Sequence, residues 1–171
     1  EAAGSTDWLP LPGALNVGFT SDALWLRLAI ERPAASPREW LLEVNNAVLD
    51  DVRLYRCTPA GAWEEHQAGE DIPRDQWDLT YRNPVFRLDL AESDQEVVWL
   101  RVSSRNSISA QVRLWRPAVF GEASRSESLA HGLLLGIYIT IIVIHLFFWR
   151  WTRSAVNGWY AFYVMDSFFH V

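Results

Sequence analysis

Between Ser128 and Trp149 the chain runs for 22 residues without a formally charged side chain. As an α-helix this run would be roughly 33 Å long at about 1.5 Å per residue, enough to cross a hydrocarbon core of about 30 Å. A buried helix of a soluble protein is usually shorter and carries a polar stripe. The run therefore predicts a transmembrane helix, which we place at residues 129–151.

The flanks of this helix predict its orientation. Aromatic residues crowd its far end, and Arg150 and Arg153 follow at once. Because short cytoplasmic loops carry an excess of Arg, we expect residues 152–158 to form a cytoplasmic loop and residues 1–128 to lie outside the cytoplasm. A second apolar run at 159–171 is too short to cross, and we interpret it as the truncated start of a second transmembrane helix in a multi-pass protein. We expect a signal peptide that was removed or lies upstream.

Charge separates the two parts of the chain and excludes one class of partner. Residues 1–128 carry 13 Arg against 20 Asp and Glu, whereas residues 129–171 carry two Arg against one acid. An acidic domain of this kind argues against a nucleic-acid partner, because duplex binding needs a basic face. The single cysteine, Cys57, excludes an internal disulfide, so the outer domain must be stabilised by packing.

The outer domain, residues 1–117, shows short segments of alternating polarity separated by turn residues. Such spacing is typical of a sandwich, and we predict an all-β jelly-roll-like sandwich followed by a transmembrane α-helix. Residues 118–128 are the expected connector. The predicted strands are Leu24 to Glu31, Trp40 to Val44, Asp51 to Cys57, Trp63 to Gln67, Val85 to Leu90, Val97 to Ser103 and Ile108 to Trp115.

Strand alternation predicts a candidate ligand-binding face. If Leu26 and Leu100 point into the core, their neighbours point to the opposite face of the sheet. Aromatic faces beside Arg and Glu suit sugar rings, whose C–H groups stack while their hydroxyls form hydrogen bonds. The alternative is that loops cover these rings as a second small core. The residues placed on this face are Trp25, Arg27, Glu43, Arg87, Trp99 and Arg101.

The loop from Gly69 to Asn83 supplies further candidates. Trp77, Arg82 and Asn83 could cap a ligand cleft, since loops carried by rigid sheets commonly do. Asp71, Asp75 and Asp78 are weak candidates for Ca²⁺, because their spacing does not fit an EF-hand and acidic surface loops are usually solvated. We therefore predict no metal site and no cofactor.

Catalysis finds little support in the outer domain. His66 is its single histidine, and no serine-centred elbow or glycine-rich phosphate loop accompanies it. Glu64 and Glu65 could imitate a glycosidase pair, but adjacent strand residues point to opposite faces. We expect no enzyme within these 171 residues.

Several segments, in order, resemble one known family. They run through most of the chain: residues 16–20, 24–27, 40–44, 49–55, 86–90 and 99–102, then 135–138, 145–148 and 159–163. This order is similar to that of the bacterial seven-transmembrane receptors with diverse intracellular signalling modules (7TMR-DISM), in their second extracellular domain type (7TMR-DISMED2) and the start of their membrane region. His145 departs from the family pattern, in which Asn is frequent, and so does the loop at Thr152–Ser154.

The resemblance implies a sensor in a bacterial inner membrane with residues 1–128 in the periplasm. Such receptors have a jelly-roll-like domain thought to bind carbohydrate or another small ligand, and a cytoplasmic output such as a histidine kinase or diguanylate cyclase. The alternatives are a module that docks a partner sensor or a second copy of itself as a homodimer, and a Ca²⁺-binding sensor.

Overall fold

The computed structural model describes residues 8–11, 13–33, 36–58, 61–90 and 95–169. The chain divides into two compact units, Glu1–Phe120 and Gly121–Val171. We call them the β unit and the helical unit.

The described part of the β unit contains nine strands and one 3-10 helix. The 3-10 helix, η2, spans Arg74–Gln76 in the loop between β5 and β6. The strands are β1 (Leu15–Gly18), β2 (Leu24–Glu31), β3 (Glu39–Val44), β4 (Asp51–Cys57), β5 (Trp63–Ala68), β6 (Val85–Asp89), β7 (Gln95–Ser103), β8 (Ile108–Ala110) and β9 (Val112–Trp115).

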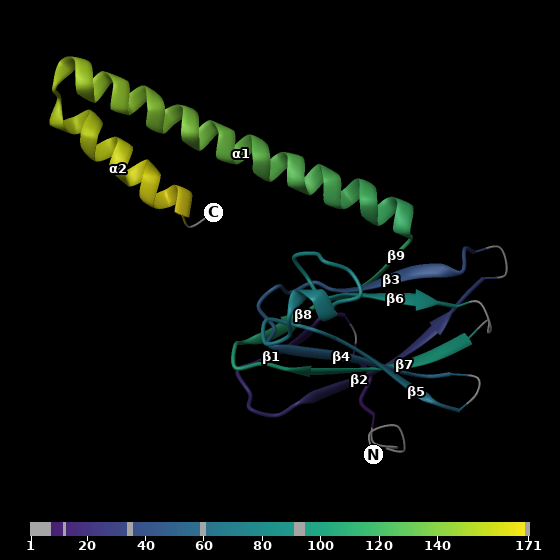
Figure 1. Cartoon of the computed structure of the whole chain (residues 1–171). Coiled ribbons are helices and arrows are strands. Elements are labelled where there is room, and N and C mark those ends of the chain that lie inside the picture. The colour runs from purple at the N-terminus through teal and green to yellow at the C-terminus, as the bar shows by residue number, and fades with distance from the viewer. Residues whose placement is uncertain (1–7, 12, 34–35, 59–60, 91–94, 170–171) are drawn as a thin grey trace. The chain divides into compact units, whose positions relative to one another are not determined.

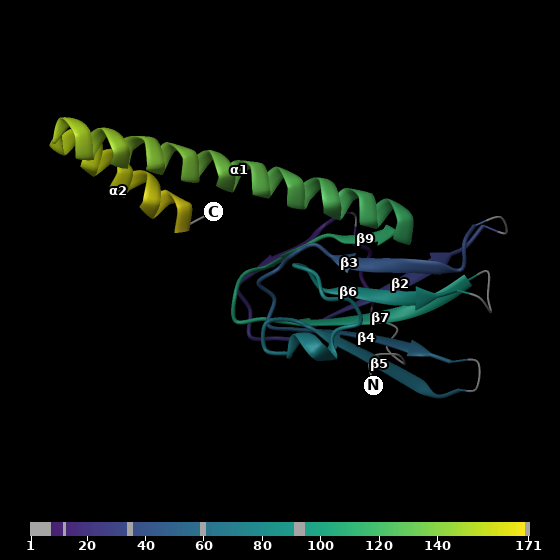
Figure 2. The ribbon, with the colours of Figure 1, turned by 45° about the horizontal axis from the view of Figure 1, so that its top comes forward.

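These strands form two antiparallel layers, which confirms the predicted β-sandwich (Figure 1). One sheet has the strand order β2-β7-β4-β5, and the other has the order β6-β3-β9. Strands β1 and β8 form a separate pair. Figure 2 shows β9 and β3 in one layer and β4 and β5 in the other. Apart from the β4–β5 hairpin, neighbours in each of these two sheets are distant in sequence, so the sandwich depends on long-range pairing.

The core lies between the two sheets and consists of the inward half of each alternating strand. Leu26, Leu100 and Leu54 stand in one cross-strand row of the four-stranded sheet. Leu42 and Phe86 face each other in the three-stranded sheet and are fully buried. Each such side chain contributes roughly 1.5–3 kcal/mol through removal from water. The predicted inward positions are therefore the positions that stabilise the fold.

One predicted strand proved wrong in detail. The expected strand from Ile108 to Trp115 is interrupted at Gln111, with β8 paired to β1 and β9 paired to β3. At the interruption the Gln111 carbonyl accepts a hydrogen bond from the Asn45 N–H. The chain changes sheets at this point, and the short strand β1 that receives β8 was not predicted.

The outer face of the three-stranded sheet is covered by a second apolar cluster. Leu41 and Val85 on this face pack with Phe120, and these three residues are buried. The partly buried residues around them are Leu79, Tyr81 and Trp115. Phe120 belongs to the first turn of helix α1 (Pro117–Thr152), so this turn is part of the β unit.

The helical unit contains the rest of α1 and the helix α2 (Ala155–Phe169). Within the described residues α1 is the one helix long and apolar enough to cross a membrane. It starts at Pro117, a residue suited to a helical N-terminus, and it includes the segment 118–128 that we expected as a connector. Helix α2 begins at Ala155, earlier than the expected residue 159. Inside the helical unit, His145 Nδ1 of α1 lies 3.3 Å from Asn157 Oδ1 of α2.

Candidate functional site

The outer face of the four-stranded sheet carries polar and aromatic side chains in register. In one cross-strand row Trp25 stands opposite Arg101, which stands opposite Arg53. In the next row Arg27 stands opposite Trp99, which stands opposite Tyr55. We call this surface the open face; its residues are Trp25, Arg27, Asp51, Arg53, Tyr55, Trp63, Glu65, Gln67, Trp99 and Arg101.

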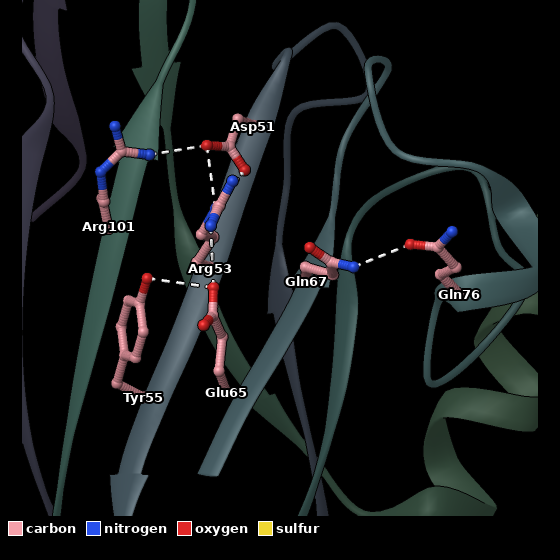
Figure 3. A network of polar contacts seen from close by, with 7 residues as sticks. All are labelled: Asp51, Arg53, Tyr55, Glu65, Gln67, Gln76 and Arg101. Carbon is pink, nitrogen blue, oxygen red and sulfur yellow. Dashed lines mark hydrogen bonds and ion pairs between the residues drawn. The ribbon is translucent and has the colours of Figure 1, made fainter. Parts of the chain in front are cut away.

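An ion-pair network occupies the β4 side of the open face (Figure 3). The Asp51 carboxylate accepts hydrogen bonds from Arg53 at 2.9 Å and from Arg101 at 2.6 Å. Arg53 also donates to Glu65 at 2.9 Å, and the Tyr55 hydroxyl donates to the same carboxylate at 3.1 Å. The hydrogen bond to Asp51 raises the pKa of Arg53, and burial and then Glu65 raise the pKa of Tyr55. Two cations and two anions thus neutralise each other on a partly buried surface.

Aromatic rings flank this network. Trp25 stacks on Tyr55 with ring centroids 5.5 Å apart and an interplanar angle of 29°. Trp63 contacts Trp99 edge to face at 5.1 Å. Trp25 is 39% exposed and Trp63 is 53% exposed, so both present ring surface to solvent. Exposed aromatic faces next to fixed polar groups are what a ring-shaped polar ligand requires.

Four of the predicted ligand residues come together on the open face. Trp25, Arg27, Trp99 and Arg101 lie on β2 and β7, as strand alternation predicted. Sequence reasoning did not select the residues contributed by β4 and β5, which are Asp51, Arg53, Tyr55, Trp63 and Glu65. The alternating pattern of the predicted strand 51–57 contained this signal, but only the pairing of β4 with β7 shows that the two strands share a sheet.

The expectation that Glu43 and Arg87 share this face is wrong. Both belong to the three-stranded sheet, on β3 and β6. Glu43 is 4% exposed and its carboxylate accepts hydrogen bonds from Asn83 Nδ2 and Trp115 Nε1, each at 2.7 Å. Alternation shows which side of its own sheet a residue occupies, but it does not show which sheet.

The loop residues expected to cap a cleft have different positions. Trp77 is buried in the core, and its Nε1 donates to the Ile72 carbonyl at 3.1 Å. The Arg74 guanidinium lies 3.9 Å from the Trp77 ring centroid. Asn83 is 3% exposed, whereas Arg82 is exposed. Trp77 and Asn83 therefore hold the 69–83 loop against the sandwich and do not cap the open face.

The three weak metal candidates do not converge. Asp71 pairs with Arg105 at 2.8 Å, Asp78 pairs with His66 at 2.8 Å, and Asp75 lies in η2. Across the part of the chain that the structure describes, no group of three or more His, Cys, Asp or Glu side chains could hold a metal ion.

Asp78 connects the edges of the two sheets. One carboxylate oxygen binds His66 on β5, and the other accepts the Arg87 N–H of β6 at 3.1 Å. The hydrogen bond to Asp78 raises the pKa of His66. Burial acts to raise the pKa of Asp78, but hydrogen bonds from His66 and the Arg87 N–H outweigh it and the pKa is lowered. The pair therefore favours its charged form, and the loop is fastened to both sheets.

The 69–83 loop also links the open face to the first turn of α1. In the middle of the loop Gln76 of η2 accepts a hydrogen bond from Gln67 of the open face at 2.8 Å (Figure 3). Near its C-terminal end the Tyr81 ring lies 4.9 Å from the Phe120 ring, measured between centroids. A continuous set of contacts inside the β unit therefore joins the candidate site to the residue that anchors the helix.

Comparison with known proteins gives one family. The sequence model described as 7TMR-DISM extracellular 2 matches residues 2–116, which is more than half of the chain and includes every strand of the sandwich. No curated protein gave a significant match. The matched domain type is the one that the order of sequence segments had suggested.

Proposed function

This chain belongs to the 7TMR-DISM extracellular 2 family, and from that premise we propose that its β unit is the periplasmic ligand-sensing part of a bacterial membrane receptor. An extracellular receptor domain fits a sensor role, and α1 is long and apolar enough to cross a membrane. In this proposal the protein is a multi-pass protein of the inner membrane. Arg150 and Arg153 face the cytoplasm, in agreement with the excess of Arg in cytoplasmic loops.

We propose that the ligand is a carbohydrate bound on the open face. The observation that carries the proposal is the contrast between the two outer faces of the sandwich. One is covered by Phe120 and its neighbours, whereas the other exposes Trp25 and Trp63 beside a fixed ion-pair network. Sugar rings stack on such aromatic faces, and their hydroxyls replace water in hydrogen bonds to carboxylate and guanidinium groups.

Binding would reach the membrane helix through the 69–83 loop. A ligand that alters the geometry of β5 acts on Gln67, whose partner Gln76 is in the loop. The same loop places Tyr81 on Phe120, in the first turn of α1. A ligand can shift this arrangement only by binding one state more tightly than the other, so the proposal requires two states of the loop with different affinities.

The test is ligand-induced stabilisation of the full 171-residue chain in lipid nanodiscs. A panel of neutral oligosaccharides is screened by thermal unfolding of the β unit. A sugar that binds and is present at 100 times its Kd should raise the free energy of unfolding by about 2.7 kcal/mol. Trp25→Ala should abolish the shift, and Phe19→Ala should retain it because Phe19 is an exposed aromatic residue outside the open face.

Two outcomes would contradict the proposal. One is a shift that Trp25→Ala leaves unchanged, which would place the ligand elsewhere. The other is the absence of any shift together with self-association that Trp63→Ala abolishes. The open face would then be a docking surface, the second function that two exposed tryptophans on a flat sheet favour.

A further inference from the structure

The open face has a neutralised half and a half with unused donors. On the β4 side Asp51 and Glu65 are already bound by Arg53, Arg101 and Tyr55. Among the described residues of the β2–β7 side, a carboxylate stands on this face at the end of β2, where Glu31 accepts a hydrogen bond from Gln95 at 3.2 Å. The cross-strand pair of Arg27 and Trp99 on this side supplies a guanidinium and an indole N–H.

Arg27 is an exposed cation without a hydrogen bond or ion pair to any residue that the structure describes. Its neighbours on the same face are Trp25 and Ala29 along β2, Trp99 directly across, and Arg101 diagonally across. The Asp51 carboxylate is already paired with Arg101 and Arg53, so it does not neutralise Arg27. A guanidinium that has no partner among the described residues and lies beside tryptophan rings is a local site for an anion, and its attraction acts against the net negative charge of the domain.

Trp99 adds a second unused donor at the adjacent position. Its Nε1 atom is shielded from solvent and has no hydrogen-bond partner among the described residues. A buried donor without an acceptor is unfavourable and is rare in folded proteins. An acceptor delivered by a ligand would satisfy it, provided that the side chains that shield this atom move aside.

We propose that the β2–β7 half of the open face binds the carboxylate of an acidic sugar, with Arg27 as its cationic partner and Trp99 Nε1 as an additional donor. This proposal rests on the proposed carbohydrate-binding function and adds the ligand's charge. Trp25 and Trp63 provide the stacking surface for the sugar ring. A planar guanidinium matches a carboxylate bidentately, so Arg27 selects charged ligands over neutral ones that have the same ring.

The test compares trigalacturonate with its fully methyl-esterified form, which keeps the rings and hydroxyls but removes the charges. Isothermal titration uses the full chain in nanodiscs. The acid should bind the wild type about tenfold more tightly than the ester, as expected for one added charge-assisted hydrogen bond, and rising salt should reduce the preference. Arg27→Gln should lose the preference and still bind the ester. Trp99→Phe, which keeps an aromatic ring, should weaken acid binding.

Arg38→Gln is the matched control, because Arg38 is an exposed arginine just before β3 and outside the open face. It should leave both affinities unchanged. Equal binding of acid and ester, or a preference that survives in Arg27→Gln, would overturn the acidic-sugar proposal while carbohydrate binding stands. If neither form binds and no neutral sugar stabilises the chain, both proposals fail. Unchanged thermal unfolding of the unliganded variants shows that their folds are intact.

Discussion

Replacing Phe120 by Ala should release the first turn of α1 from the β unit. The Phe120 ring is 7% exposed and lies 4.9 Å from Tyr81 and 6.1 Å from Trp115, measured between ring centroids. Truncation of a buried Phe to Ala typically costs about 3–5 kcal/mol. We take the lower value, about 3 kcal/mol, because Tyr81 and Trp115 are only partly buried and can close over part of the space.

The assay is hydrogen exchange of the amide at residue 120 in the full chain. This N–H donates to the Arg116 carbonyl at 2.9 Å, so its exchange reports opening of the first turn. If the ring supplies about 3 kcal/mol to that turn, its loss should accelerate exchange about 100-fold, since about 1.4 kcal/mol is a factor of ten. Val119→Ala is the control, because Val119 lies in the same turn and is 47% exposed. It should change exchange less than about threefold.

Two results would refute this reasoning. Exchange at residue 120 that is unchanged in Phe120→Ala would show that the turn is held by its own backbone. Equal acceleration in Val119→Ala would show that side-chain volume in the helix, and not packing on Tyr81, controls opening. In either case the 69–83 loop would lack the physical link to α1 on which the proposed signalling route depends.

Three further predictions concern the stability of variants with a single substitution. Asp78 raises the pKa of His66 above its ordinary 6.5, so the pair stabilises the fold fully below pH 6.5 and loses this effect as the pH rises through the folded pKa. In denaturant titrations His66→Gln should therefore be less stable than the wild type by about 1 kcal/mol at pH 5.5, and this difference in stability should narrow toward pH 9. Leu100→Ala, which empties a fully buried position, should cost about 3 kcal/mol in the same titrations, and a value below about 1 would contradict the assigned core. Gly69→Ala should lower the free energy of unfolding by about 2 kcal/mol or more, because φ is +135° and a Cβ would collide with the backbone just before β4. Gly61→Ala is the control: φ is +80° but the space around it is open, so the loss should be only about 1 kcal/mol.

The alternation of apolar residues determined how well the strands could be predicted. The limits of β2 and β4 agree with the predicted segments, since a period of two repeats over seven or eight residues in each. The transmembrane helix candidate was equally clear because an uncharged run of this length has few other uses. Where the pattern was short, as in β1, or continued past a change of sheet, as at Gln111, local periodicity could not show the partner strand.

The candidate site was only half predictable for a related reason. Trp25 and Trp99 could be placed on one face from their own strands, but Glu43 satisfied the same pattern and is buried beneath another loop. Its partners Asn83 and Trp115 lie 40 and 72 residues away in sequence. Asn83 was taken for a loop residue available to a ligand. Long-range hydrogen bonds of this kind have no local sequence signal.

In the proposed signalling route the two outer faces of the sandwich have different roles. Phe120 fills the cluster on one face, so the start of α1 follows that sheet. The open face lies on the other sheet, and the two sheets are joined at one edge by the 69–83 loop through His66, Asp78 and the β6 backbone. A ligand on the open face therefore need not deform the core to reach the helix. It needs only to favour one position of a loop that contacts Gln67 through Gln76 and Phe120 through Tyr81.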